Sequence, residues 1–387
     1  MEKVQFPRFM VAAEKSGQGK TLITCALLEL LKEQHRVSAF KCGPDYIDPM
    51  FHRRVAGVPS YNLDSFFSSR EELIQLFSLH GGPDRLGVIE GVMGYYDGLG
   101  GSTDRASSYE VAERTHTPVI LVADGQGRSF STLAAVRGFL NFRPDSHIKG
   151  VLFNRLSPML YPALKRAAEE ELGIRAVGFV PPLGEEFRLK SRHLGLLRPE
   201  EIPGFREEIH RLAETLRPGI DLEAILSIAK EAEPLPARRR SLPQIRKENG
   251  EKPVIAVAMD EAFCFYYQDN LETLDAELRF FSPIHDEKVP GEADGLYLGG
   301  GYPELYGKEL SENASMRASV RELLAQGMPC IAECGGFLYL QKELEGRPMV
   351  GFLPGTGHNT ASPGPCAVCF QGEAGTAEGF PDSATGS

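Results

Sequence analysis

The stretch Glu14–Thr21, which reads EKSGQGKT, constrains the fold of this chain more than any other. A short apolar run predicts a strand over Phe9–Ala13, and apolar periodicity predicts a helix over Lys20–Lys32. Glycines in such a loop let backbone N–H groups close around phosphate oxygens, and the helix N-terminus adds partial positive charge. The lysine then reaches the β- and γ-phosphates, and the threonine hydroxyl ligates Mg²⁺. Rather than a glycine-rich turn with a chance lysine, we predict a phosphate loop that binds through Gly17, Gly19, Lys20 and Thr21.

Short apolar runs alternate with helix-length segments along the first half of the chain. Further buried strands are expected over Val37–Phe40, Val88–Glu90, Val119–Ala123 and Val151–Asn154, and Pro162–Leu172 has helical periodicity. Continuous apolar strands are typical of parallel sheets that are covered on both faces. The alternation therefore predicts an α/β fold with a doubly wound parallel sheet.

Composition narrows the class of protein. The net charge of −11 argues against a general nucleic-acid-binding protein. No apolar run is long enough to span a membrane, and the first predicted strand comes too early for a signal peptide. The seven cysteines are an odd and scattered set, which indicates reduced thiols. We expect a cytoplasmic protein with small-molecule partners, without nucleic-acid or membrane partners.

The second half of the chain has its own α/β pattern. Strands are expected over Val254–Ala258, Leu278–Phe281, Gly295–Leu298 and Cys330–Ala332. After about Pro354 the apolar periodicity stops, and Gly, Ala, Ser and Pro accumulate, as is typical of disorder. The predicted organisation is a phosphate-loop domain over 1–230, a proline- and charge-rich linker over 231–252, an incomplete second domain over 253–354 and a disordered tail over 355–387.

Residues 41–52, KCGPDYIDPMFH, place Asp45 and Asp48 between two prolines. Proline fixes its own φ and biases the preceding residue away from helix, so we expect a rigid turn that presents both carboxylates together. Paired acids near a phosphate loop indicate a Mg²⁺ site or an acid–base site. The alternative is a surface turn, since Asp, Gly and Pro are common turn residues.

Two further acids follow the strand expected over Val88–Glu90. Glu90 stands at the carboxyl end of that strand, where α/β sheets bind ligands, and is a candidate to hold Mg²⁺ opposite Thr21. The alternative is an acid satisfied by loop amides. Asp97 lies in a glycine-flanked turn, where a structural role and a functional role are both open.

Cys334 lies in CIAECGGF (330–337), which runs from a strand through a Gly-Gly turn into a helix. This is the layout of a nucleophile elbow, in which a strained turn exposes a thiol at a helix N-terminus. The GGGYPE loop (299–304) supplies N–H groups at Gly300 and Gly301 for an oxyanion hole. A buried, inert thiol is the alternative. A base is also required, and His358, the one histidine after Cys334, lies in the stretch without periodicity.

Together these motifs resemble the cobyrinate a,c-diamide synthase family, ATP-dependent glutamine amidotransferases of cobalamin biosynthesis. The resemblance covers about residues 9–354 and lies in KCGPDYIDPMFH (41–52), NLD (62–64), EGVMGYYDG (90–98), RHLGL (192–196), DEAFCFYYQDNLE (260–272), LGGGYPELY (298–306) and AECGGFLYL (332–340).

The resemblance implies a synthetase domain similar to dethiobiotin synthetase, followed by a class I glutaminase-like α/β domain. ATP would phosphorylate the a and c carboxylates of cobyrinate or hydrogenobyrinate, and ammonia from glutamine would then displace the phosphate. The resemblance implies that Lys20 and Thr21 bind ATP–Mg²⁺, that Cys334 is the glutaminase nucleophile, and that Asp45, Asp48 and Glu90 lie around metal and substrate, with Asp45 and Asp48 as catalytic candidates. Asp97, Arg192 and His193 are candidates for substrate contacts, and for the RHLGL segment core packing is the alternative. A homodimer is compatible with this sequence, which does not fix the oligomeric state.

Two other functions stay open, and one departure from the family matters. Ni-sirohydrochlorin a,c-diamide synthases share these motifs, and Lys15 resembles the second lysine of deviant phosphate-loop ATPases that act as switches. Ala13 stands where many amidoligases open the loop with glycine. The family supplies its glutaminase histidine beyond residue 354, where this sequence matches nothing. We therefore expect a synthetase half that uses free ammonia and a glutaminase half that is impaired.

Overall fold

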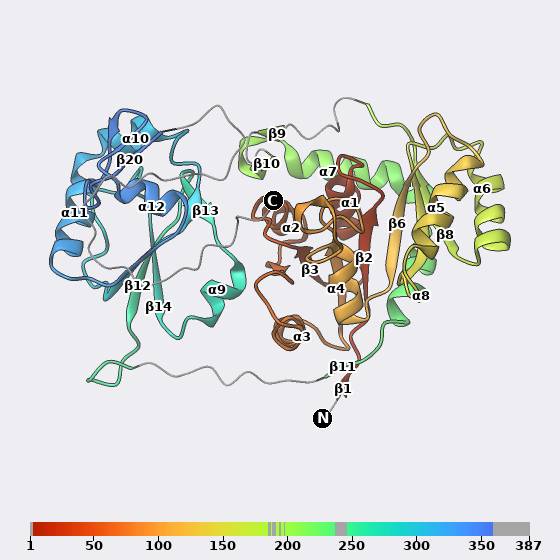
Figure 1. Ribbon diagram of the computed structural model, residues 1–387, viewed down its shortest axis with the longest axis horizontal. Coiled ribbons are helices and arrows are strands. Elements are labelled where there is room, and N and C mark those ends of the chain that lie inside the picture. The colour runs from red at the N-terminus through yellow and green to blue at the C-terminus, as the bar shows by residue number, and fades with distance from the viewer. Residues whose placement is uncertain are drawn as a thin grey trace, which may run out of the picture. The chain divides into compact units, whose positions relative to one another are not determined.

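The computed structural model describes residues 3–184, 187, 191–192, 195–196, 198–236 and 246–358 (Figure 1). The chain divides into two compact units, which are described one at a time. Unit 1 comprises Met1–Ser241 together with Tyr267–Glu272, and unit 2 comprises Leu242–Tyr266 together with Thr273–Ser387. Unit 1 thus includes a six-residue segment from the second half of the sequence.

Unit 1 is built on a seven-stranded parallel sheet in the order β4-β3-β5-β2-β6-β7-β8. Its strands are β2 (Arg8–Ala13), β3 (Arg36–Cys42), β4 (Ser60–Leu63), β5 (Arg85–Glu90), β6 (Val119–Asp124), β7 (Ile148–Asn154) and β8 (Arg175–Val180). Two antiparallel ribbons accompany it, β1 (Lys3–Val4) with β11 (Leu235–Pro236), and β9 (Ser191–Arg192) with β10 (Gly195–Leu196). The parallel sheet predicted from the sequence is confirmed.

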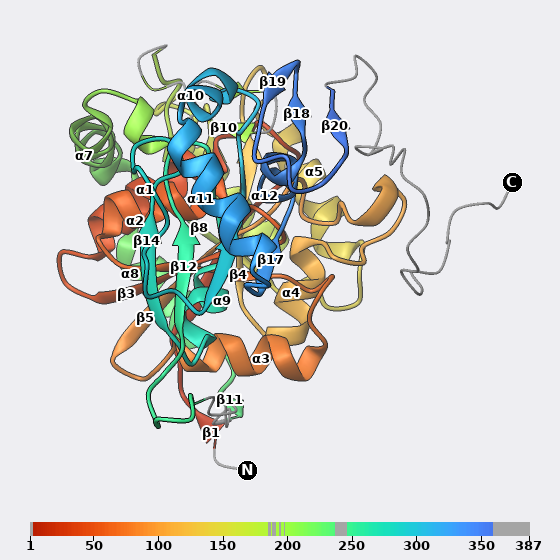
Figure 2. The same cartoon turned by 90° about the vertical axis from the view of Figure 1, so that its left-hand side faces the viewer.

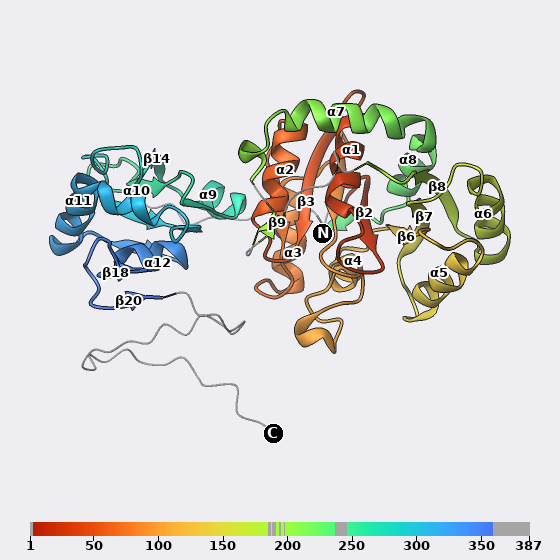
Figure 3. The same ribbon diagram turned by 90° about the horizontal axis from the view of Figure 1, so that it is seen from above.

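Helices cover both faces of this sheet. Figure 3 shows α1, α2 and α7 on one face and α3, α4 and α5 on the other. The helices are α1 (Lys20–Leu31), α2 (Ile47–Ala56), α3 (Arg70–Leu79), α4 (Ser108–Thr115), α5 (Ser131–Asn141), α6 (Tyr161–Ala167), α7 (Phe205–Leu216) and α8 (Leu222–Lys230). Because both faces are covered, all six residues of β2 and of β6 are buried.

The strand order places the phosphate loop at a switch point of the sheet. β2 lies between β5 and β6. The strand that follows β2 in sequence, β3, lies on one side of it, whereas the strand that follows β6, β7, lies on the other side, so the switch point is at the carboxyl ends of β2 and β6. Crevices at such points bind ligands in open α/β sheets. Glu90, the last residue of β5, lies beside Val11 of β2. The loop and this acid therefore meet at the carboxyl ends of two central strands, β2 and β5.

The segment 41–52 differs from the rigid turn that the sequence predicts. α2 begins at Ile47, so Asp48 and Pro49 lie in its first turn. Proline is tolerated there because the N–H groups of a first turn have no partner within the helix. Asp45 Oδ1 accepts the N–H groups of Ile47 and Asp48 at 2.9 and 3.0 Å, which caps the helix. Only the part before residue 47 is a turn.

Unit 2 has a four-stranded parallel sheet in the order β14-β12-β15-β17. The four strands expected from the sequence are confirmed as β12 (Val254–Ala258), β14 (Glu277–Phe281), β15 (Gly295–Leu298) and β17 (Cys330–Ala332). Figure 2 shows α11 (Ala314–Ala325) in front of this sheet. Its Met316, Val320 and Leu324 join Leu296 and Leu298 in the core.

Short elements complete unit 2. They are β13 (Phe263–Phe265), β16 (Gly300–Gly301), α10 (Gly307–Glu312), α12 (Gly335–Leu340), β18 (Glu343–Leu344), β19 (Arg347–Pro348) and β20 (Thr356–Gly357). The helix α9 (Gln268–Thr273) belongs to unit 1 except for Thr273. Throughout the part of the chain that the structure describes, every helix is too short or too polar to cross a membrane.

Candidate active site

The phosphate loop has the backbone that anion binding requires. Gly17 and Gly19 both have φ of 73°, a left-handed conformation that favours glycine, and Gly19 immediately precedes α1. The Asn154 side chain fixes the loop by donating to Gln18 O at 2.8 Å. The loop therefore opens directly onto the N-terminus of α1, as predicted.

Lys20 is buried at the start of α1. Its Nζ donates to Met93 O at 2.5 Å, so the lysine lies across the loop that follows β5. Burial and the nearby charge of Lys41 lower the pKa of Lys20 to about 8. A lysine held in this way gains from an anionic ligand, because phosphate oxygens would stabilise its charged form.

Three carboxylates surround the buried Lys41 on β3. Its Nζ lies 2.6 Å from Asp48 Oδ2, 3.1 Å from Glu90 Oε1 and 3.8 Å from Asp45 Oδ2. The structure thus brings together Asp45, Asp48 and Glu90, which the sequence singles out, around a lysine for which the sequence predicts no role. The signal for this lysine was its place directly after the apolar residues Ala39 and Phe40 of a predicted buried strand.

Glu90 is the most connected of these acids. Oε1 accepts the Thr21 hydroxyl at 2.8 Å, and Oε2 lies 2.7 Å from His52 Nε2, whose other ring nitrogen lies 3.0 Å from Ser60 Oγ. Burial alone would raise the pKa of Glu90, but Lys41 and His52 together hold it well below its usual range. Glu90 is therefore a fixed, ionised carboxylate.

The opposite holds for Asp48. Burial and the charge of Glu90 raise its pKa well above the usual range, against the effect of Lys41. One lysine thus cannot neutralise all the acids in this cluster. A further cation would therefore be stabilised here.

The donor set fits Mg²⁺ bound together with nucleotide phosphates. Thr21 Oγ1 lies 3.3 Å from Asp48 Oδ1 as well as 2.8 Å from Glu90 Oε1, so one hydroxyl and two carboxylates converge. Mg²⁺ at such sites uses one or two carboxylates and takes its other ligands from phosphates and water. Among the residues that the structure describes, no group of three or more His, Cys, Asp or Glu side chains forms a complete metal cage.

The remaining predicted residues of unit 1 are less central. Asp97 is exposed, and its Oδ2 accepts the Gly94 N–H at 2.9 Å, which closes the loop after β5. This loop also carries Met93, the partner of Lys20. For Arg192 the structure describes only the backbone, in β9, and His193 lies outside the described residues.

In unit 2, Cys334 lies in the sharp turn that its sequence predicts. Its φ of 48° and ψ of −107° are a strained conformation for a residue with a side chain, and the residue is exposed. It precedes α12, and the Gly336 N–H donates to Gly299 O at 2.9 Å. Strand, turn and helix therefore form an elbow that presents the thiol.

Part of the glycine loop (299–304), in which the sequence predicts an oxyanion hole, is a short strand. Gly300 and Gly301 form β16, which pairs antiparallel with β13. At Gly301, φ is 157° and a Cβ would lie 2.0 Å from Ala262 O, so only glycine fits. The loop still adjoins the elbow, because a Cβ at Gly300 would lie 3.5 Å from the Cys334 Cβ. Its role as an oxyanion hole stays a prediction.

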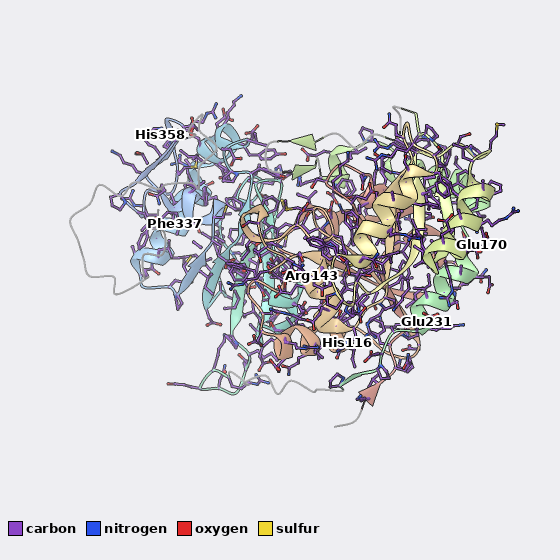
Figure 4. All side chains as sticks on the ribbon, turned by 45° about the vertical axis from the view of Figure 1, so that its right-hand side comes forward. His116, Arg143, Glu170, Glu231, Phe337 and His358 are labelled. Carbon is purple, nitrogen blue, oxygen red and sulfur yellow. The ribbon has the colours of Figure 1, made fainter. Side chains whose placement is uncertain are left out.

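His358, the one histidine after Cys334, is the last residue that the structure describes. Figure 4 shows it well apart from Phe337, which is three residues after Cys334. His358 is exposed and follows β20. The structure therefore gives no reason to assign it as the base for the thiol.

Comparison with known proteins decides the family. Residues 9–196 match the CobQ/CobB/MinD/ParA nucleotide binding domain, and residues 254–358 match the CobB/CobQ-like glutamine amidotransferase domain. The cobyrinate a,c-diamide synthase of Thermoplasma volcanium is 40% identical over 361 residues, which cover 91% of this chain and 78% of that protein. The cobyrinate a,c-diamide synthase of Listeria innocua is 41% identical over 358 residues, with coverage of 90% and 78%. The chain belongs to the cobyrinate a,c-diamide synthase family.

This family membership accounts for both units. The nucleotide-binding match contains the phosphate loop and the acid cluster, and the amidotransferase match contains Cys334 and the glycine loop. Among solved structures, chloroplast FtsY from Physcomitrella patens is similar over 54% of this chain and 66% of its own, at 13% identity and a TM-score of 0.36. A likeness of that size adds nothing to the assignment.

Proposed function

We propose that this chain catalyses the ATP-dependent amidation of the a and c carboxylates of cobyrinate or hydrogenobyrinate, with glutamine or ammonia as the nitrogen donor. The observation that carries this proposal is the contact between the phosphate loop and the acid cluster. Thr21, beside the phosphate-binding lysine, hydrogen-bonds to Glu90, which is itself bound to Lys41. Nucleotide phosphates and a metal cation would therefore meet at the carboxyl ends of the central strands β2 and β5.

The chemistry follows from the poor reactivity of a carboxylate. A substrate carboxylate oxygen attacks the γ-phosphorus of ATP, which yields an acyl phosphate and ADP. Ammonia then attacks the carbonyl carbon, phosphate leaves, and the nitrogen loses a proton. Lys20 stabilises the charge on the transferred phosphoryl group. Thr21, Asp48 and Glu90 would hold Mg²⁺, which neutralises phosphate charge when bound.

In this proposal unit 2 would release ammonia from glutamine through Cys334, and we expect this activity to be impaired, so that free ammonia is the main nitrogen donor. The Cys334 sulfur attacks the side-chain carbonyl carbon of glutamine, ammonia leaves with the thiol proton, and water hydrolyses the thioester to glutamate. The exposed elbow supports this role for Cys334. The glycine loop at 300–301 would donate hydrogen bonds to the oxyanion.

A substrate panel tests this function. The full chain would be incubated with ATP, Mg²⁺ and an ammonium salt, together with cobyrinate, hydrogenobyrinate or Ni-sirohydrochlorin. The products would be identified by mass spectrometry. We expect mono- and diamides of the corrinoid acids. Amidation of Ni-sirohydrochlorin alone would reassign the substrate, and ATP hydrolysis without any amidation would favour a nucleotide switch.

Replacing the elbow thiol should separate the two nitrogen donors. We expect Cys334→Ala to abolish whatever amidation the chain carries out with glutamine and to leave the rate with ammonium salts unchanged. The reason is that the thiol acts only on glutamine. Cys25→Ala is the matched control, because Cys25 is a buried thiol in α1. Glutamine-dependent amidation that survives in Cys334→Ala would contradict the assignment.

ATP binding should weaken as the pH rises. The pKa of Lys20 is lowered to about 8, so the free protein keeps this charge at pH 7 and loses it as the pH passes 8. Since phosphates bind the charged form, the Kd of ATP should rise about tenfold between pH 7 and pH 9. Titration calorimetry measures this directly. Lys20→Arg, which stays charged, should show little change over this range, and a flat wild-type profile would contradict the prediction.

A further inference from the structure

The segment Tyr267–Glu272 belongs to unit 1 although the sequence around it belongs to unit 2. It lies inside the stretch that matches the amidotransferase domain, residues 254–358. The segment itself is part of unit 1, while Tyr266 before it and Thr273 after it are counted in unit 2. Ordering such a segment costs conformational entropy, which its contacts must offset. These contacts therefore indicate the role of the segment.

Its first residue holds the end of β4. The Tyr267 hydroxyl donates to Asp64 Oδ2 at 2.8 Å, and Asp64 is buried just after β4. Burial and the charge of Asp64 both raise the pKa of Tyr267, which keeps the hydroxyl protonated as a donor. A hydrogen bond between a half-buried hydroxyl and a carboxylate is among the stronger kinds.

The same tyrosine also packs on the acid-bearing loop. Its ring lies 5.1 Å from the ring of Tyr46, at an interplanar angle of 32°. Tyr46 stands between Asp45 and Asp48, directly before α2. Tyr267 thus contacts the residue that joins the two acids.

The loop and the end of β4 form one hydrogen-bonded piece. Asn62 Nδ2 donates to Gly43 O at 3.0 Å and to Asp45 O at 2.7 Å, and the Gly43 N–H donates to Leu63 O at 3.0 Å. Asp64 follows directly. A contact that restrains Asp64 or Tyr46 therefore also restrains the backbone of Asp45.

Further contacts anchor the rest of the segment. Asp269 Oδ1 lies 2.6 Å from His80 Nε2, and both side chains are largely buried. The His80 ring stacks on Tyr61 at 3.3 Å, and the Tyr61 hydroxyl donates to Glu272 Oε1 at 3.3 Å. The segment is therefore held at both ends against β4 and the residue that follows α3.

We propose that Tyr267 is a positioning residue of the synthetase site. Through Asp64 and Tyr46 it holds the backbone over 43–46, so that Asp45 faces the polycarboxylate substrate in a fixed arrangement. This inference rests on the proposed function. Its consequence is that amidation with free ammonia, which needs no glutamine hydrolysis, still depends on a segment of the amidotransferase sequence.

The test measures ammonia-dependent amidation of cobyrinate by the full chain. Tyr267→Phe removes the hydroxyl and keeps the ring, and we expect it to raise the KM for cobyrinate roughly tenfold while the KM for ATP stays unchanged. Tyr161→Phe is the matched control, because it removes a tyrosine hydroxyl that donates to Ala176 O elsewhere in unit 1. Thermal unfolding of each variant reports on the fold.

A double-mutant cycle separates positioning from general destabilisation. If Tyr267 acts through Asp64, then Tyr267→Phe combined with Asp64→Asn should raise the KM for cobyrinate no further than Asp64→Asn alone. Additive effects, or an unchanged KM in Tyr267→Phe, would overturn the inference. Absence of amidation by the wild-type chain would instead count against the proposed function.

Discussion

Replacing Lys20 with alanine is expected to lower ATP-dependent amidation by about 10³-fold. Lys20 is the buried cation of the phosphate loop, and its Nζ reaches across to Met93 O. Removing it takes away the charge that stabilises the transferred phosphoryl group. The rate with saturating ammonia and cobyrinate measures the effect.

The same substitution should not lower stability. Burial lowers the pKa of Lys20 to about 8 from 10.5, so the charged side chain opposes folding at neutral pH. We therefore expect Lys20→Ala to unfold at a Tm equal to or above that of the wild type. Lys165→Ala, at a half-exposed lysine paired with Glu169, is the control and should keep full activity. A Lys20→Ala protein that folds and remains active would contradict the phosphate-loop assignment.

Glu90→Gln is expected to lower both activity and stability. We expect a loss of amidation of about 10²-fold or more, because the carboxylate that would hold Mg²⁺ beside Thr21 is gone. Glu90 is buried and its charged carboxylate accepts hydrogen bonds from Thr21 and Lys41, so the loss of that charge should cost about 2 kcal/mol. Urea denaturation measures the free energy of unfolding.

The pH dependence of unfolding gives this prediction a second readout. The folded-state pKa of Glu90 lies well below 4.5, so its stabilisation is complete above the unfolded value and is lost as the pH falls through the folded value. Glu90→Gln should therefore make stability less dependent on pH below about 4.5. The control is Glu231→Gln, which breaks a half-exposed pair with Arg175 and should cost less than about 1 kcal/mol. Equal costs in the two variants would contradict the role of the buried cluster.

The phosphate loop and the elbow could be predicted from the sequence because each is a local pattern. EKSGQGKT needs only its neighbours to form a strand, a loop and a helix, and the same holds for the turn at Cys334. The segment 41–52 shows the limit of such patterns. Its second proline suggested a turn, yet a first helical turn accepts proline equally well, and α2 begins at Ile47.

Contacts between distant residues could not be predicted in this way. Lys41 belongs to the site because its ammonium group donates a hydrogen bond to Glu90. Glu90 is 49 positions away in the sequence and lies beside Lys41 only because β3 pairs with β5. His52 likewise meets Glu90 across the sheet edge, 38 positions away. Tyr267 is 203 positions from Asp64, and no local periodicity indicates that it joins unit 1. The contacts of these residues depend on the strand order and tertiary packing, which could not be predicted from one sequence.

One measurement tests the central claim, that unit 1 activates a corrinoid carboxylate with ATP and passes it to ammonia. Cobyrinate with heavy oxygen in its carboxylates would be incubated with the full chain, ATP, Mg²⁺ and an ammonium salt, and both products would be weighed by mass spectrometry. The account predicts an amide at each reacted carboxylate and one heavy oxygen in the phosphate released with it. Phosphate without the heavy oxygen, or ATP hydrolysis with cobyrinate unchanged, would contradict it.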